Sequence, residues 1–103
     1  MIGSDFSRTP YYNGTNGKDH WPVGSFIIME KNASWTNRMV GQTDEGQNAF
    51  KINPNTLERD DRDGTIIYPK HVHKALRRHL GIENSAIEQN LAFANTEDFD
   101  FFS

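Results

Sequence analysis

The sequence predicts an α/β fold with few strands, one clear helix over residues 69–80, and long loops. Residues 23–29 form an apolar run of strand length, and residues 69–80 carry an apolar stripe at helical spacing. The chain has 10 Asn and 8 Gly among 103 residues, and both types favour turns. This length allows one domain at most, with a small core.

The first quarter of the chain is predicted to contain two strand segments separated by a long loop. Residues 1–6 are expected to be the end of a strand. Residues 23–29 (VGSFIIM) are expected to be a buried strand. The intervening residues 7–22 are rich in turn-forming pairs, so we expect a loop. It exceeds the usual ceiling of about 12–15 residues, and loops of that size are often functional.

The middle of the chain is predicted to be mostly irregular. Residues 32–37 are expected to be a turn and residues 38–43 a short strand. Residues 44–65 mix acids, Asn, Pro and Gly, which favours an irregular excursion. Ile52 is assigned to a weak edge strand within it.

The helix over 69–80 has recognisable start and stop signals. Pro69 suits its first turn, and Gly81 suits its C-terminal cap. Basic residues fill its later turns, where cations complement the helix dipole. Among its histidines, His71 and His73 are two residues apart and do not share a face, which argues against a helical two-histidine metal site. A packed or capping histidine is the alternative.

The charge of the chain is unevenly distributed. Net charge is −3, yet residues 83–103 carry five acids and no Lys or Arg, which leaves residues 1–82 mildly basic. Such a balance does not favour a nucleic-acid partner. No apolar run approaches a membrane span, and the absence of Cys excludes disulfides and thiolate metal sites. We expect residues 83–103 to be an acidic, Phe-containing surface tail.

Carboxylate and imidazole side chains near the first loop are candidate metal ligands. Asp5 lies at the end of the first strand segment, and Asp19 and His20 close the loop. Such O and N donors suit divalent ions (Zn, Mn, Ca or Mg) rather than thiophilic metals. The alternative is that Asp19 caps a turn and His20 lies on the surface.

Two cations in the same loop are candidate anion contacts. The planar fork of Arg8 suits bidentate binding of a phosphate or sulfate, and Lys18 adds a second charge. The alternative for Arg8 is pairing with Asp5 or Asp19 as loop scaffolding. No residue stands in a nucleophile-elbow pattern, and no phosphate-binding glycine loop is present.

Several motifs in order resemble one bacterial family. These are Ser4-Asp5-Phe6-Ser7-Arg8-Thr9-Pro10, Gly17-Lys18-Asp19-His20-Trp21-Pro22, Val40-Gly41-Gln42-Thr43-Asp44-Glu45 and the helix that ends in Leu80-Gly81-Ile82. Residues 1–82 thereby resemble the C-terminal part of the domain of unknown function 1501 family. That family belongs to the alkaline phosphatase and sulfatase superfamily. The resemblance implies the C-terminal fragment of a doubly wound alkaline-phosphatase-like fold.

The resemblance also implies roles for individual residues. Asp5 falls at the Asp of a metal-binding Asp-His pair, with Phe6 in place of the His, and His20 falls at a later His of the site. A rival alignment places Asp19-His20 at the pair itself. His73 falls at the His of the family's helix, which implies a place in the second shell of the site.

The superfamily carries its nucleophile and first metal carboxylate in an N-terminal half that this chain does not contain. The resemblance therefore implies a missing N-terminal part as partner, an anionic ester as substrate and, in the parent, metal-dependent ester hydrolysis. A non-catalytic binding protein with a degenerate metal site is the alternative. A third hypothesis is an interaction module whose acidic-aromatic tail binds a basic partner. Family members are often exported, but nothing in this chain reports a compartment.

Overall fold

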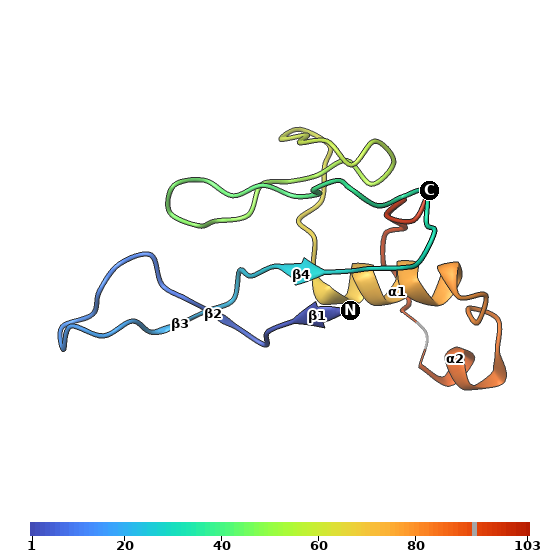
Figure 1. Ribbon diagram of the computed structural model, residues 1–103, viewed down its shortest axis with the longest axis horizontal. Coiled ribbons are helices and arrows are strands. Elements are labelled where there is room, and N and C mark those ends of the chain that lie inside the picture. The colour runs from blue at the N-terminus through green and yellow to red at the C-terminus, as the bar shows by residue number, and fades with distance from the viewer. Residues whose placement is uncertain (92) are drawn as a thin grey trace.

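The computed structural model describes residues 1–91 and 93–103 as a small domain with short antiparallel strands, two helices and many loops (Figure 1). The strands span two residues each: β1 (Ile2–Gly3), β2 (Ser7–Arg8), β3 (His20–Trp21) and β4 (Phe26–Ile27). The helices are α1 (Pro69–His79) and α2 (Ala86–Asn90). No doubly wound sheet is present among these described residues. None of their helices is long and apolar enough to cross a membrane.

The β1–β4 ribbon joins the start of the chain to its first apolar run. The strands are antiparallel, with Ile2 opposite Ile27 and Gly3 opposite Phe26. A Cβ atom at Gly3 would lie 2.1 Å from Cδ1 of Phe26, so the aromatic ring occupies the space above this glycine. The absence of a side chain at residue 3 is therefore what allows Phe26 to lie across the ribbon.

The predicted buried strand over 23–29 is wrong in both length and burial. Only Phe26 and Ile27 pair as a strand. Ile27 is 59% exposed and Ile2, opposite it, is 58% exposed. The apolar pattern predicts extended chain, which Phe26 and Ile27 adopt, but both side chains stay exposed.

The loop predicted over 7–22 is a long hairpin whose two ends pair with each other. Strands β2 and β3 are antiparallel, with Ser7 opposite Trp21 and Arg8 opposite His20. The Thr9 N–H donates to the carbonyl of Asp19 at 3.0 Å, which extends the pairing by one step. The segment is thus more ordered than its turn-rich composition predicts.

The middle of the chain contains isolated bridges rather than strands. Thr43 bridges Ala49, and Ile52 bridges both Arg59 and Thr65. The short strand expected over 38–43 is reduced to the bridge at Thr43. Ile52 is buried and hydrogen-bonds Thr65 in both directions, so it lies between two neighbours and not at an edge.

Helix α1 confirms the clearest element of the sequence. It begins at Pro69 and ends at His79, one residue before the predicted end. Gly81 adopts φ +72°, and the N–H groups of Gly81 and Ile82 donate to the carbonyls of Arg78 and Arg77. These two bonds satisfy free carbonyls of the last turn, as a Schellman motif does.

The core lies between α1, the middle loops and the C-terminal segment. The buried apolar side chains of the described residues are Trp35, Ile52, Val72, Ala75 and Phe99. The expectation that residues 83–103 form a surface tail is wrong at Phe99, which is fully buried. The alternation of Asp and Phe over residues 98–101 is only four residues long, and no strand forms there, so the burial of Phe99 comes from its packing against α1.

Candidate functional site

Asn13 organises the tip of the β2–β3 hairpin. Its Oδ1 accepts hydrogen bonds from the backbone N–H of Thr15 and of Gly17, both at 3.0 Å, and from the Thr15 hydroxyl at 2.9 Å. Its Nδ2 donates to Oδ1 of Asp19 at 2.9 Å. One short polar side chain therefore closes the turn and orients the carboxylate of a predicted ligand.

The two predicted anion contacts lie on the same hairpin as His20. Arg8 is opposite His20 across the β2–β3 ladder, and its Nη1 donates to the Lys18 carbonyl at 3.2 Å. The guanidinium also lies over the Phe6 ring, 5.3 Å from the centroid. The Lys18 ammonium lies 5.1 Å from the Tyr12 ring centroid. Both cations are exposed and make no ion pair among the described residues.

The predicted metal ligands Asp5, Asp19 and His20 are all exposed and do not make a complete metal site. His20 stacks flat against Phe6, with ring centroids 3.6 Å apart. Side chains alternate along an extended chain, which directs Asp19 and His20 to opposite sides. Within residues 1–91 and 93–103, no three His, Cys, Asp or Glu side chains gather so that they could hold a metal ion. This donor set does not fit a resident metal without further ligands, because zinc sites use at least three protein ligands.

His73, the predicted second-shell residue, is an exposed residue of α1. The hairpin lies far from this helix along the long axis of the molecule (Figure 1). The ring nearest to His73 is Phe93, with centroids 6.4 Å apart. Among the described residues, His73 is therefore not brought together with Asp5, Asp19 and His20.

His71 is the polar residue that the structure buries most deeply, at 1% exposed. Its ring Nδ1 accepts a hydrogen bond from the Tyr68 backbone N–H at 2.9 Å. The backbone N–H of His71 donates to the Tyr68 carbonyl. Its Nε2 lies 2.8 Å from Oε2 of Glu97. Since Nδ1 is an acceptor, the ring proton is on Nε2 and is donated to the carboxylate. His71 thus caps the start of α1 and holds the C-terminal segment at once.

Glu97 responds to this contact. A hydrogen bond from its own backbone N–H and a second from the His71 ring lower the pKa of the Glu97 carboxyl below 4.5. Both donors favour the charged form of the acid. The carboxylate is therefore the form that the folded chain holds against His71.

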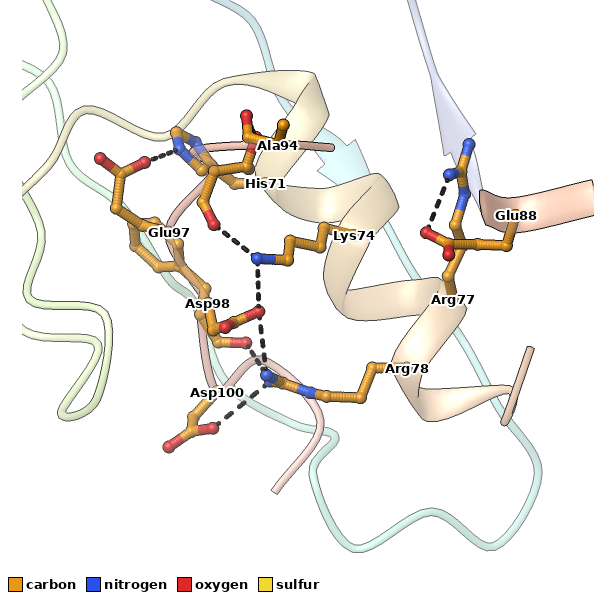
Figure 2. Close-up of polar contacts among 11 residues, drawn as sticks. His71, Lys74, Arg77, Arg78, Glu88, Ala94, Glu97, Asp98 and Asp100 are labelled. Carbon is orange, nitrogen blue, oxygen red and sulfur yellow. Dashed lines mark hydrogen bonds and ion pairs between the residues drawn. The ribbon is translucent and has the colours of Figure 1, made fainter. Parts of the chain in front are cut away.

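The same helix face carries basic side chains that meet the acids of residues 97–100 (Figure 2). Lys74 Nζ lies 3.0 Å from Oδ1 of Asp98, and Arg78 lies 3.2 Å from the same oxygen. Arg78 also pairs with Asp100 at 3.5 Å. Asp98 and Asp100 are 56% and 48% exposed, so they face solvent as expected and are at the same time the counter-ions of Lys74 and Arg78.

An aromatic cluster lies at the end of α1. The Glu30 carboxylate accepts the Trp35 indole N–H at 3.0 Å and contacts His79 Nε2 at 3.1 Å. The His79 ring stacks on Phe102 with centroids 4.7 Å apart, and Trp35 meets Phe102 edge-on at 5.0 Å. The hydrogen bonds from His79 and then Trp35 lower the pKa of Glu30.

Comparison of the chain with protein-family models, with curated proteins and with solved structures finds no match. The geometry of its own residues is therefore what supports any proposal about function.

The sequence reasoning missed His71 and Glu97, although one signal was available. His71 stands two residues after Pro69, at the third helical position, where a side chain can reach back to the N-cap backbone. A packed or capping histidine is the alternative given for this helix, but the sequence does not single out His71 for that role. The contact between Glu97 and His71 spans 26 residues and has no local signature.

Proposed function

We propose that the chain is the C-terminal part of a protein of the domain of unknown function 1501 family, within the alkaline phosphatase and sulfatase superfamily. In this proposal residues 1–82 belong to an alkaline-phosphatase-like domain and residues 83–103 follow it. The missing N-terminal part supplies the nucleophile and the first metal carboxylate. The parent binds an anionic ester, phosphoric or sulfuric, and hydrolyses it.

One observation carries the proposal. The two motifs on which the resemblance depends most, residues 4–10 and 17–22, lie side by side, with Arg8 opposite His20. Segments that are separate in the sequence are thereby gathered on one hairpin, as a shared binding role requires. Binding residues are often carried on loops of this kind.

The proposed roles follow from the chemistry of each side chain. Arg8 and Lys18 are exposed cations that contact the ester anion. His20 and Asp5, with Asp19 as the alternative, contribute ligands to a divalent ion (Zn, Mn, Ca or Mg), and the remaining ligands come from outside these residues. A bound divalent ion would polarise the ester oxygen. His73 enters the second shell only if residues of the missing part connect it to the hairpin.

A second candidate function is a non-catalytic binding protein on the same fold. It is favoured by Phe6, which stands where the resemblance implies an imidazole and stacks on the His20 ring at 3.6 Å. The stacked pair is an aromatic surface beside Arg8, which suits binding of an anionic, planar ligand without chemistry. The two candidates differ in whether a metal is required.

The proposal is tested first by the coding DNA upstream of Met1. An in-frame extension that encodes an alkaline-phosphatase-like N-terminal part is the expected result. An upstream stop codon without such an extension contradicts it. In the extended protein, metal content and ester hydrolysis are then measured for wild type and His20→Ala.

The two candidates give different results in that second measurement. We expect His20→Ala to lower metal affinity by about 10-fold or more if the imidazole contacts the bound ion. Lys31→Ala, on an exposed turn after the ribbon, is the matched control and leaves the affinity unchanged. Metal-independent binding of an anionic ester, with no hydrolysis, assigns the chain to the non-catalytic alternative.

A further inference from the structure

One face of α1 is occupied by a segment from the far end of the chain. His71, Lys74 and Arg78 are spaced three and four residues apart, so they lie on one side of the helix. We call these three residues the basic face. Each of the three side chains has at least one partner within residues 94–103, which we call the acidic strap. Figure 2 shows these side chains directed toward one another.

The polar groups of the two surfaces are complementary along their length, because the His71 ring donates a hydrogen bond and the cations Lys74 and Arg78 make ion pairs. Glu97 meets His71, Asp98 meets both Lys74 and Arg78, and Asp100 meets Arg78. Each acid of the strap therefore has a partner on the basic face. Pairing along a series of positions sets the register of an extended segment, and like charges placed there cost several kcal/mol.

The basic face also contacts the backbone of the strap. Lys74 Nζ donates to the carbonyl of Thr96, and Arg78 Nη2 donates to the carbonyl of Phe99 at 3.0 Å. Arg38, from the middle of the chain, donates to the carbonyls of Asp100 and Phe101. Contacts to carbonyls do not depend on the side chain at that position, so they suit binding of an extended peptide.

An apolar anchor lies between the acids. Phe99 is fully buried, with its ring centroid 5.0 Å from that of His71. Phe102 stacks on His79, which lies one turn beyond Ala75 on α1. A buried aromatic anchor surrounded by charged contacts is the arrangement that carries most of the affinity at peptide and protein interfaces.

The strap itself contains no helix or strand. Its backbone makes one long-range hydrogen bond to other backbone, from Asp100 N–H to the carbonyl of Pro54 at 2.9 Å. Side chains of α1, Arg38 and the aromatic cluster provide the other contacts. The strap is therefore held as a bound peptide is held. Its contacts are a buried aromatic side chain and ion pairs, and not the backbone hydrogen bonds of a β-sheet.

We propose that the basic face of α1 is a binding surface for an acidic peptide with Phe between two Asp residues, and that the acidic strap occupies this surface in cis. A partner carrying such a segment competes with the strap. A tethered segment acts at an effective concentration in the mM range, so the strap keeps the surface closed until a stronger or more concentrated partner displaces it.

The test exchanges the charges on the two sides, in the full-length chain. Arg78→Glu places a carboxylate opposite Asp98 and Asp100 and repels the strap. The probe is a labelled peptide of residues 94–103 that carries Asp100→Lys, because Asp100 pairs with Arg78 whereas Asp98 also pairs with Lys74. The unchanged peptide is tested beside it. Binding is measured by fluorescence anisotropy at low salt, and helix content by circular dichroism. The matched control is Arg62→Glu, which makes the same charge change on a side chain that is 92% exposed.

The expected result is a specificity exchange. The Lys-bearing peptide binds Arg78→Glu at least about 10-fold more tightly than it binds Arg62→Glu, and the unchanged peptide does not bind Arg78→Glu. Equal binding of the Lys-bearing peptide to both variants overturns the proposal. Loss of the helical signal in Arg78→Glu also overturns it, because a displaceable strap is not required for α1 to form. A wild-type dimer in which the strap of each copy binds α1 of the other would show that the surface binds a second copy of this chain. That result would contradict the proposal of a different partner.

Discussion

The N-terminal ribbon and hairpin differ from α1 and the acidic strap in how they use apolar side chains. The ribbon leaves Ile2, Phe26 and Ile27 exposed, whereas the strap buries Phe99 completely. None of the buried apolar side chains of the described residues precedes Trp35. The apolar residues of the ribbon are thus exposed, whereas a Phe set between two acids is the one that packs. Burial depends on an available partner surface, which α1 supplies to the strap.

The largest expected effect is at the strap's anchor. Phe99→Ala removes a fully buried ring, so we expect the free energy of unfolding to fall by about 3–5 kcal/mol. Phe26→Ala in the ribbon is the matched control, and its effect should stay below about 1 kcal/mol because the ring is 44% exposed. Urea unfolding followed by circular dichroism measures both. Similar losses for the two variants would show that the ribbon is as well packed as the strap.

The second-largest expected effect on stability distinguishes His71 from His73. His71→Ala leaves the Tyr68 N–H without its acceptor and Glu97 without its donor, so we expect a loss of about 1–3 kcal/mol. His73→Ala, at an exposed position, should change stability by less than about 0.5 kcal/mol. Denaturant unfolding of both variants measures these two changes in stability. A larger loss of stability for His73→Ala would contradict the conclusion that His71 connects the start of α1 to the strap.

The third effect is a dependence of stability on pH. The Glu97 pKa is lowered in the folded chain, so the carboxylate contributes stability that is present above 4.5 and is lost as pH falls through the lowered folded pKa. Glu97→Gln cannot titrate, and we expect its stability to fall less steeply than that of wild type below pH 4.5. Glu83→Gln, at an exposed position outside the strap, should keep the wild-type slope. Thermal melts at a series of pH values between 3 and 7 would measure this, and identical slopes for Glu97→Gln and wild type would contradict the prediction.

The smallest effect belongs to the hairpin tip. Asn13→Ala removes the acceptor of the Thr15 and Gly17 amides, so we expect these two amides to exchange faster with solvent. Because the hairpin contributes nothing to the apolar core, global stability should change by less than about 0.5 kcal/mol. Hydrogen exchange followed by NMR gives both values. A global loss comparable to that of His71→Ala would show that the hairpin and the core unfold as one unit.

The candidate site could be read only in part from the sequence. Asp5, Arg8, Lys18, Asp19 and His20 were named from residue chemistry and motif order, and the pairing of Arg8 with His20 agrees with their shared loop. A surface position for His20 was one of the two alternatives, whereas the stacking of Phe6 on His20 was not predicted, because it depends on which face of a short ladder each side chain takes. His71 was passed over because its partner Glu97 is 26 residues away in sequence.

The sequence by itself determined α1, since its signals are local: Pro69 at the first turn, an apolar stripe at helical spacing, and Gly81 at a left-handed position after the last turn. It also determined that most of the chain is loop, through its Asn, Gly and Pro content. Only the tertiary structure decided which apolar residues are buried and where the acids of residues 97–100 lie. Those outcomes depend on contacts between Phe99, His71 and Arg78, and contacts between residues more than 20 positions apart leave no periodic trace in the sequence.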